Sequence, residues 1–138
     1  MQFSHLETTS HHFQYIEVGK GLPVIFLHGY PGRPQDFRWL FPFLSPFKII
    51  SLALPNLSLT TTKKGSKPPT TINERAGSIK EFVFAMEIDQ CLVVTHSMGG
   101  PIGVALAKQI PDRVLGLVLI SSVGLYPYRA FRRSKPHL

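Results

Sequence analysis

The chain of 138 residues has a single cysteine, few acidic residues and no long hydrophobic run. Cys91 is alone, which excludes an internal disulfide, and its place at the start of an apolar segment predicts an inert, buried thiol. The longest apolar run, Val114–Ile120, is far shorter than the roughly 20 residues that cross a bilayer. No apolar segment of a secretory signal is visible near the N-terminus. We therefore expect a cytoplasmic protein without a membrane partner.

Acidic residues are outnumbered, because eight Asp and Glu stand against fifteen Lys and Arg and give a net charge of +7. Such a balance suits nucleic acid or an anionic membrane when the basic residues cluster. Two clusters occur, one in a Thr- and Pro-rich stretch (Lys63, Lys64 and Lys67) and one near the C-terminus (Arg129, Arg132, Arg133 and Lys135). No nucleic-acid-binding motif accompanies them. A solvated loop and a frayed tail explain both clusters, so we expect no nucleic-acid partner.

The hydrophobic pattern predicts an α/β protein. A content of 43% hydrophobic and 17% charged residues is typical of one folded domain. After a strand or hairpin in residues 3–18, strands and helices alternate, which favours a mostly parallel sheet with flanking helices. The expected strands are residues 24–27, 47–54, 91–95 and 114–121, and the expected helices are 34–44, 72–86 and 98–109. Pro42 should kink the first helix, Trp39 and its neighbouring phenylalanines should pack in the core, and Thr71 with Glu74 forms a capping box for the second helix.

Three histidines, His5, His11 and His12, lie in the first predicted strand region. The adjacent pair could be considered as metal ligands. However, no cysteine or carboxylate stands at ligand spacing from them. We therefore expect exposed strand or hairpin residues here and no metal site.

The most informative segment is residues 91–103, C-L-V-V-T-H-S-M-G-G-P-I-G. A buried strand ends and a helix begins around His96 and Ser97, so Ser97 lies on a strand-to-helix turn. A sharp turn there raises the hydroxyl above the carboxyl edge of the sheet, toward the unpaired N–H groups of the helix start. Gly99 and Gly100 let helix and strand approach closely. Either the turn presents a nucleophile, or S-M-G-G is a glycine-rich helix start that binds nothing.

This turn resembles the nucleophile elbow G-x-S-x-G of the α/β-hydrolase family, with Ser97 at the serine and Thr95 in place of the first glycine. A second motif, H-G-Y-P-G at residues 28–32, resembles the family's oxyanion loop. Fixed backbone donors in such a loop stabilise the negative charge of a tetrahedral intermediate. The resemblance implies that Ser97 is the nucleophile and that the backbone N–H groups of Tyr30 and Met98 form the oxyanion hole.

The resemblance also implies structural roles at the site for five residues, His28, Gly29, His96, Gly99 and Gly100. His28 could be considered as a base, but in the family this histidine holds the loop by hydrogen bonds, and we expect that role here. The loop at residues 53–60, A-L-P-N-L-S-L-T, departs from the family pattern D-x-P-G-x-G-x-S. Asn56 can adopt positive φ there, and the Thr- and Lys-rich continuation to residue 69 is expected to be mobile.

The acid and base of a catalytic triad are not found after Ser97. In this family the chain order is serine, acid and histidine, each at the carboxyl end of a later strand. The only later acid, Asp112, precedes the last predicted strand and so falls at the opposite edge of the sheet. The only later histidine, His137, lies in the basic tail. We therefore expect an incomplete α/β-hydrolase fold, with residues 1–125 as a partial core, 126–138 as a basic tail that begins the lid region, and the last strands missing.

Two functions remain as hypotheses. The resemblance implies a serine hydrolase that acts on esters or related acyl bonds of a small-molecule substrate, needs no metal or organic cofactor, and is inactive as it stands. A serine rather than an aspartate at the elbow disfavours haloalkane and epoxide chemistry. The alternative is a non-catalytic remnant or a binding protein. In either case Val114–Ile120 would be an apolar edge strand, through which we expect the chain to self-associate.

Overall fold

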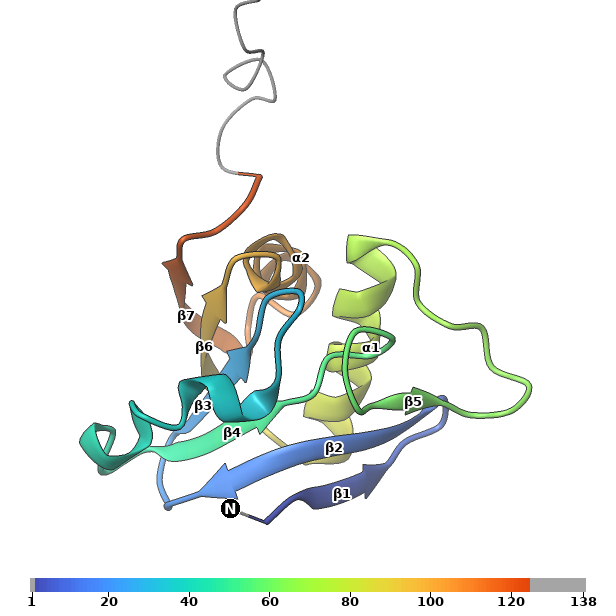
Figure 1. Ribbon diagram of the computed structural model, residues 1–138. Coiled ribbons are helices and arrows are strands. Elements are labelled where there is room, and N and C mark those ends of the chain that lie inside the picture. Colours follow the sequence, from blue (N-terminus) through green and yellow to red (C-terminus); the bar gives the residue numbers. More distant parts are fainter. Residues whose placement is uncertain (1, 125–138) are drawn as a thin grey trace, which may run out of the picture.

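The computed structural model describes residues 2–124, and the predicted basic tail lies outside them. A seven-stranded sheet with the order β1-β2-β4-β3-β6-β7 forms its centre, and the short β5 pairs with β2 (Figure 1). The strands are β1 (Ser4–Glu7), β2 (His11–Val18), β3 (Pro23–Leu27), β4 (Lys48–Leu52), β5 (Thr61–Thr62), β6 (Cys91–His96) and β7 (Val114–Ile120). The neighbours β4, β3, β6 and β7 run parallel, whereas β1 and β2 are antiparallel additions. The predicted α/β class with a mostly parallel sheet is confirmed.

Two helices, α1 (Ile72–Ala85) and α2 (Gly99–Gln109), cover one face of the sheet (Figure 1). The predicted capping box begins α1, because the Thr71 hydroxyl accepts the N–H of Glu74 at 3.2 Å and the Glu74 carboxylate accepts the N–H of Thr71 at 3.0 Å. Between helices and sheet lies the larger hydrophobic core, which includes Ile25, Ile50, Val93, Ile79, Phe82, Ile102 and Leu106. No helix within residues 2–124 has the length and apolar character needed to cross a membrane.

The opposite face is covered by two short 3-10 segments, η1 (Pro34–Phe37) and η2 (Phe41–Phe43). The prediction of one α-helix over residues 34–44 is wrong. Pro42 has no N–H to donate, so an α-helical hydrogen-bond ladder cannot continue through it, and the chain makes two separate turns instead of one kinked helix.

The aromatic residues of these segments are divided between core and surface. Phe37 and Phe41 pack against Phe26 of β3 as expected, with ring centroids 4.9 and 5.9 Å from it. Trp39, which was expected in the core, is exposed, and so is Phe43. The expectation failed for these two because it assumed a continuous helix with one apolar face.

The prediction of exposed histidines holds for His5 and His12 but is wrong for His11, which is only 3% exposed. Its Nε2 lies 3.3 Å from the hydroxyl of Ser78, and its Nδ1 lies 3.5 Å from the carboxylate of Glu81. Ser78 and Glu81 belong to α1. His11 is therefore a buried polar connection between β2 and α1.

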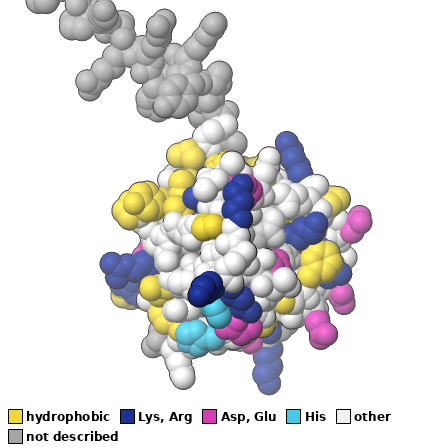
Figure 2. Space-filling model, turned by 90° about the vertical axis from the view of Figure 1, so that its right-hand side faces the viewer, with side chains coloured by type: hydrophobic (Ala, Val, Ile, Leu, Met, Phe, Trp, Pro, Cys, Tyr) yellow, Lys and Arg dark blue, Asp and Glu magenta, His cyan; other side chains and the backbone are white. Residues whose placement is uncertain are grey.

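The Thr- and Lys-rich stretch that was expected to be mobile contains β5, which pairs with β2. Two of its lysines form ion pairs, Lys63 with Glu7 at 2.8 Å and Lys67 with Glu74 at 2.9 Å. On the side of the molecule seen in Figure 2, Lys and Arg side chains are interspersed with acidic and histidine side chains. This side therefore has mixed charge. In the preceding loop, Asn56 has the positive φ that was predicted, 58°.

Candidate active site

Ser97 lies at the turn between β6 and α2 and has a backbone φ of 51°. This left-handed conformation is unfavourable for serine and costs about 1–3 kcal/mol. Three hydrogen bonds hold it. The N–H of Ser97 donates to the carbonyl of Ile120 at 3.0 Å, and the carbonyl of Ser97 accepts the N–H groups of Gly100 at 3.0 Å and Val123 at 3.2 Å. The strained turn is therefore fixed both by α2 and by the segment that follows β7.

Two glycines allow backbones to touch at this turn. A Cβ atom added to Gly99 would lie 2.4 Å from the carbonyl oxygen of Leu27 at the end of β3. One added to Gly29 would lie 2.9 Å from the Cβ of Ser97. Contacts this short are not tolerated in close-packed interiors. The start of α2, the end of β3 and the loop at Gly29 are thus packed directly against one another.

Thr95, which replaces the family's first glycine, is accommodated by the packing between α2 and the sheet. Its side chain is buried, and its hydroxyl donates to the carbonyl of Val118 at 3.2 Å. Its methyl group points to Gly103, where an added Cβ would lie only 2.6 Å away. A glycine one turn into α2 therefore provides the room that the threonine occupies. Gly100 has a similar role beside Ser122, whose hydroxyl would lie 1.8 Å from an added Cβ.

His28 is buried below this loop, and both of its ring nitrogens are occupied. The N–H of Leu54 donates to Nε2 at 3.1 Å, so the proton of the neutral ring is on Nδ1, which lies 2.7 Å from the carbonyl oxygen of Gly29. Burial lowers the pKa of His28 below its ordinary value of 6.5. A neutral imidazole with both nitrogens engaged has no position free to accept a proton from Ser97.

The backbone N–H groups of Tyr30 and Met98 donate no hydrogen bond within the described residues. Tyr30 follows Gly29 and Met98 follows Ser97, and Gly29 and Ser97 are in contact. The two amides therefore belong to adjoining backbone segments. Met98 also precedes the first turn of α2, where unpaired N–H groups carry partial positive charge. An anionic oxygen next to Ser97 can be stabilised by such donors.

A cavity of about 460 Å³ opens in front of Ser97. Its lining consists of His28, Gly29, Tyr30, Pro31, Gly32, Asp36, Phe37, Leu40, His96, Ser97 and Ile120. The apolar residues Phe37, Leu40 and Ile120 come from η1, the turn after it and β7. Sequence reasoning missed these three, because they are brought to Ser97 only by tertiary packing. The cavity has the size and the mixed lining of a small-molecule site.

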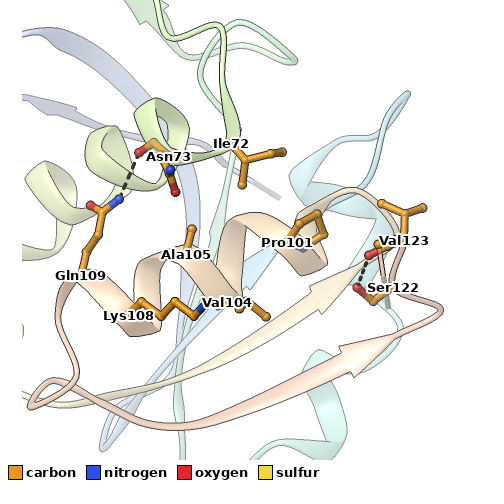
Figure 3. A pocket seen from close by; sticks show the side chains of 10 residues that line it. Ile72, Asn73, Pro101, Val104, Ala105, Lys108, Gln109, Ser122 and Val123 are labelled. Atoms are coloured by element: carbon orange, nitrogen blue, oxygen red, sulfur yellow. Dashed lines mark hydrogen bonds between the residues drawn. The ribbon is translucent and has the colours of Figure 1, made fainter. Parts of the chain in front are cut away.

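A second cavity of about 360 Å³ lies between α1, α2 and the segment after β7 (Figure 3). Its polar groups largely satisfy one another, because the side-chain amide of Gln109 donates to the carbonyl of Asn73 at 3.1 Å and the Ser122 hydroxyl donates to the carbonyl of Val123 at 3.0 Å. Ser97 is not part of its lining. The first cavity is therefore the candidate reaction site.

No hydrogen bond joins the Ser97 hydroxyl to an acidic or histidine side chain within the described residues, so a triad is not assembled there. Asp36 lines the same cavity but accepts the N–H of Arg33 at 2.8 Å. Asp112 is exposed and precedes β7, whereas Ser97 adjoins Ile120 at the other end of that strand. The two ends of a seven-residue strand lie roughly 20 Å apart. His96 lines the cavity, and His137 lies outside the described residues.

Comparison with known proteins agrees with this architecture. A model of the alpha/beta hydrolase fold matches residues 23–137. The dihydrolipoyllysine-residue acetyltransferase component of the acetoin cleaving system of Cupriavidus necator is 33% identical over 115 residues, which cover 80% of this chain and 29% of that protein. A 2-hydroxy-6-oxo-6-(2'-aminophenyl)hexa-2,4-dienoic acid hydrolase of Metapseudomonas resinovorans is 31% identical over 119 residues, 81% of this chain and 39% of that protein.

Among solved structures, a variant of the meta-cleavage product hydrolase CumD superposes with a TM-score of 0.78 at 25% identity, over 88% of this chain and 45% of that one. The chain thus spans less than half the length of each of these similar proteins. The matched region includes both the loop at Gly29 and the turn at Ser97. The chain belongs to the α/β-hydrolase fold family.

Proposed function

We propose that Ser97 is the nucleophile of a serine hydrolase that acts on esters or related acyl bonds of small molecules. The observation that carries the proposal is the strained turn at Ser97, which is packed against Gly29 and opens onto the cavity. Strained backbone persists only where surrounding structure maintains it, and it is concentrated at functional sites. Membership of a hydrolase family supports the same reaction class.

In the proposed reaction the Ser97 hydroxyl oxygen attacks the acyl carbonyl carbon, and the carbonyl oxygen becomes an oxyanion. The N–H groups of Tyr30 and Met98 donate to that oxyanion, and collapse of the intermediate expels the alcohol and leaves an acyl-serine. Phe37, Leu40 and Ile120 provide an apolar wall for the acyl group. Water then attacks the acyl-serine and releases the acid.

The reaction also needs a base to take the Ser97 proton and pass it to the leaving alcohol, and we propose that neither this base nor its orienting acid lies within residues 2–124. His28 is engaged at both nitrogens, and Asp112 lies at the far end of β7. Loss of the base in a serine protease lowers turnover by about a million-fold and leaves only the contribution of oxyanion hole and binding. We expect the 138-residue chain to react stoichiometrically and slowly, without efficient turnover.

Labelling with a fluorophosphonate probe tests the proposal. We expect slow formation of one phosphonyl adduct, located on Ser97 by peptide mass spectrometry. Ser97→Ala should abolish the adduct, whereas Ser122→Ala, a matched change close to the same turn, should not. Labelling of another residue, or equal labelling of the Ser97→Ala variant, would refute the assignment.

A non-catalytic binding protein is the second candidate, and the remoteness of Asp112 from Ser97 favours it. In this case the turn at Ser97 is retained only as part of the fold. The complete absence of an adduct at saturating probe, with the chain folded, would support this candidate over the first.

A further inference from the structure

The two edges of the sheet differ in chemistry. β1 forms one edge and contains His5 and Glu7, which are both exposed. Polar and charged residues of this kind discourage another strand from pairing with an edge. β7 forms the other edge and consists of V-L-G-L-V-L-I, with neither a charge nor a proline. Within residues 2–124 no strand pairs with its outer side.

Apolar side chains are exposed along β7. Leu115 is 52% exposed and Val118 is 53% exposed. Val118 is in register with Val94 of β6, which is only partly buried, as is the neighbouring Leu92 on the same face. The unpaired backbone edge of β7 is thus accompanied by an apolar surface two strands wide.

We propose that β7 pairs in antiparallel orientation with β7 of a second copy of this chain, so that the two sheets become one. Pairing centred on Leu117 places Gly116 of one copy opposite Val118 of the other, and Val114 opposite Ile120. The register of β7 with β6 shifts between Val114 and Gly116, which makes Leu115 the one irregular position of the strand. Such a contact is two-fold symmetric and closes at a dimer. It does not depend on the function proposed for Ser97.

β7 itself places no charge against a second copy, although each chain carries a net charge of +7 and α2, which packs over β7, has the exposed Lys108 in its last turn. Arg113, the basic residue next to it, is directed to the carbonyl of Ile88 and the carboxylate of Asp89 and stacks on the ring of Phe84. An identical strand therefore meets an apolar partner rather than a like charge.

The helices fit the same arrangement. α2 packs over both β6 and β7. With neighbouring strands about 4.8 Å apart, the two-fold pairing places the α2 axes of the two copies about 10 Å apart, which is the spacing of packed helices. Contact between the two α2 helices therefore adds a second layer to the interface.

The contact is small. The two ends of β7 lie roughly 20 Å apart, and a sheet with one helix layer is about 20 Å deep, so the interface buries on the order of 400–500 Å² on each copy. A total of about 1,000 Å² is the lower limit for a specific interface. Interfaces of this size belong to weak, reversible complexes, so we expect monomer and dimer to exchange within the micromolar concentration range.

Sedimentation equilibrium of the full chain over a concentration series tests this proposal. The mass should rise from 15.4 kDa to twice that value and then stay constant. Val118→Lys should raise the dissociation constant at least tenfold, because a lysine in the middle of an edge strand blocks pairing. Leu115→Lys, on the same strand, should do the same. The matched control is Val18→Lys, which changes a 41% exposed valine of β2 and should leave the dissociation constant unchanged.

Circular dichroism melts of each variant show that it is folded, since all three changed side chains are largely exposed. A wild-type chain that stays monomeric throughout the micromolar range overturns the proposal. An equal rise in the dissociation constant for Val18→Lys and Val118→Lys also overturns the proposal, because this result indicates non-specific hydrophobic association. A mass that grows beyond that of the dimer also overturns the proposal, because a two-fold contact closes at two copies. Ser97→Ala should leave the dissociation constant unchanged. The dimer proposal and the proposed function of Ser97 can therefore be confirmed or refuted independently.

Discussion

The packing of α2 against the end of β3 can be tested by substituting one glycine. Gly99→Ala adds a Cβ that would lie 2.4 Å from the carbonyl oxygen of Leu27 and 2.9 Å from that of His28. An ordinary contact between such atoms is about 3.3 Å. The start of α2 must therefore move by about 0.9 Å, and because both contacts are to backbone, no side-chain rotation can relieve them. Overpacking of this kind lowers stability by about 1–3 kcal/mol.

The matched control is Gly77→Ala, in the middle of α1. The nearest atom to an added Cβ there is 3.9 Å away, so alanine fits without displacement. Replacement of a helical glycine by alanine should then raise stability by about 0.5–1 kcal/mol. Both substitutions replace glycine by alanine, yet their effects on the free energy of unfolding should have opposite signs.

Urea denaturation followed by circular dichroism, at one fixed protein concentration, measures both free energies of unfolding. The displacement should also reach Ser97, and a misplacement of about 1 Å can slow a reaction about a hundredfold, so labelling of Ser97 by a fluorophosphonate should fall in Gly99→Ala and not in Gly77→Ala. A Gly99→Ala variant as stable as the wild type would refute the close approach of helix and strand.

Three further predictions concern buried polar groups. Because burial lowers the pKa of His28, the unfolded chain binds a proton more readily than the folded one as pH falls below 6.5. Stability should therefore decrease below that pH by at most about 1.4 kcal/mol per pH unit, and His28→Gln should remove this slope in pH-dependent urea melts. Burial raises the pKa of Cys91 to about 11, so iodoacetamide at pH 8 should label the thiol in urea but not in the folded chain, and rapid native labelling would contradict its burial. Thr95→Val loses the hydrogen bond to the carbonyl of Val118 but keeps the methyl group beside Gly103, so it should lower the free energy of unfolding in urea melts by about 1 kcal/mol, and an unchanged value would contradict that bond.

Local patterns of the sequence were sufficient to predict the elements that position the site. The capping box at Thr71 depends on residues three positions apart, and the turn at Ser97 depends on a strand, two glycines and a helix that are contiguous in the chain. Such signals are short-range, so they can be recognised without knowledge of the fold. The same holds for the positive φ of Asn56.

What could not be predicted depends on contacts between distant segments. His11 is buried because Ser78 and Glu81, about seventy positions away, lie beside it. Ile120 and Leu40 line the cavity only because β7 and the turn after η1 converge on Ser97. The prediction of a helix over residues 34–44 failed for a local reason, because it gave the spacing of the apolar residues more weight than Pro42.

The most direct measurement of the central claim is a crystal structure of the chain after phosphonylation of Ser97. We predict a phosphonyl oxygen about 3 Å from the backbone nitrogens of both Tyr30 and Met98, with the alkyl group against Phe37, Leu40 and Ile120. A phosphonyl group whose oxygens face solvent, with neither amide within hydrogen-bond distance, would contradict the proposed site.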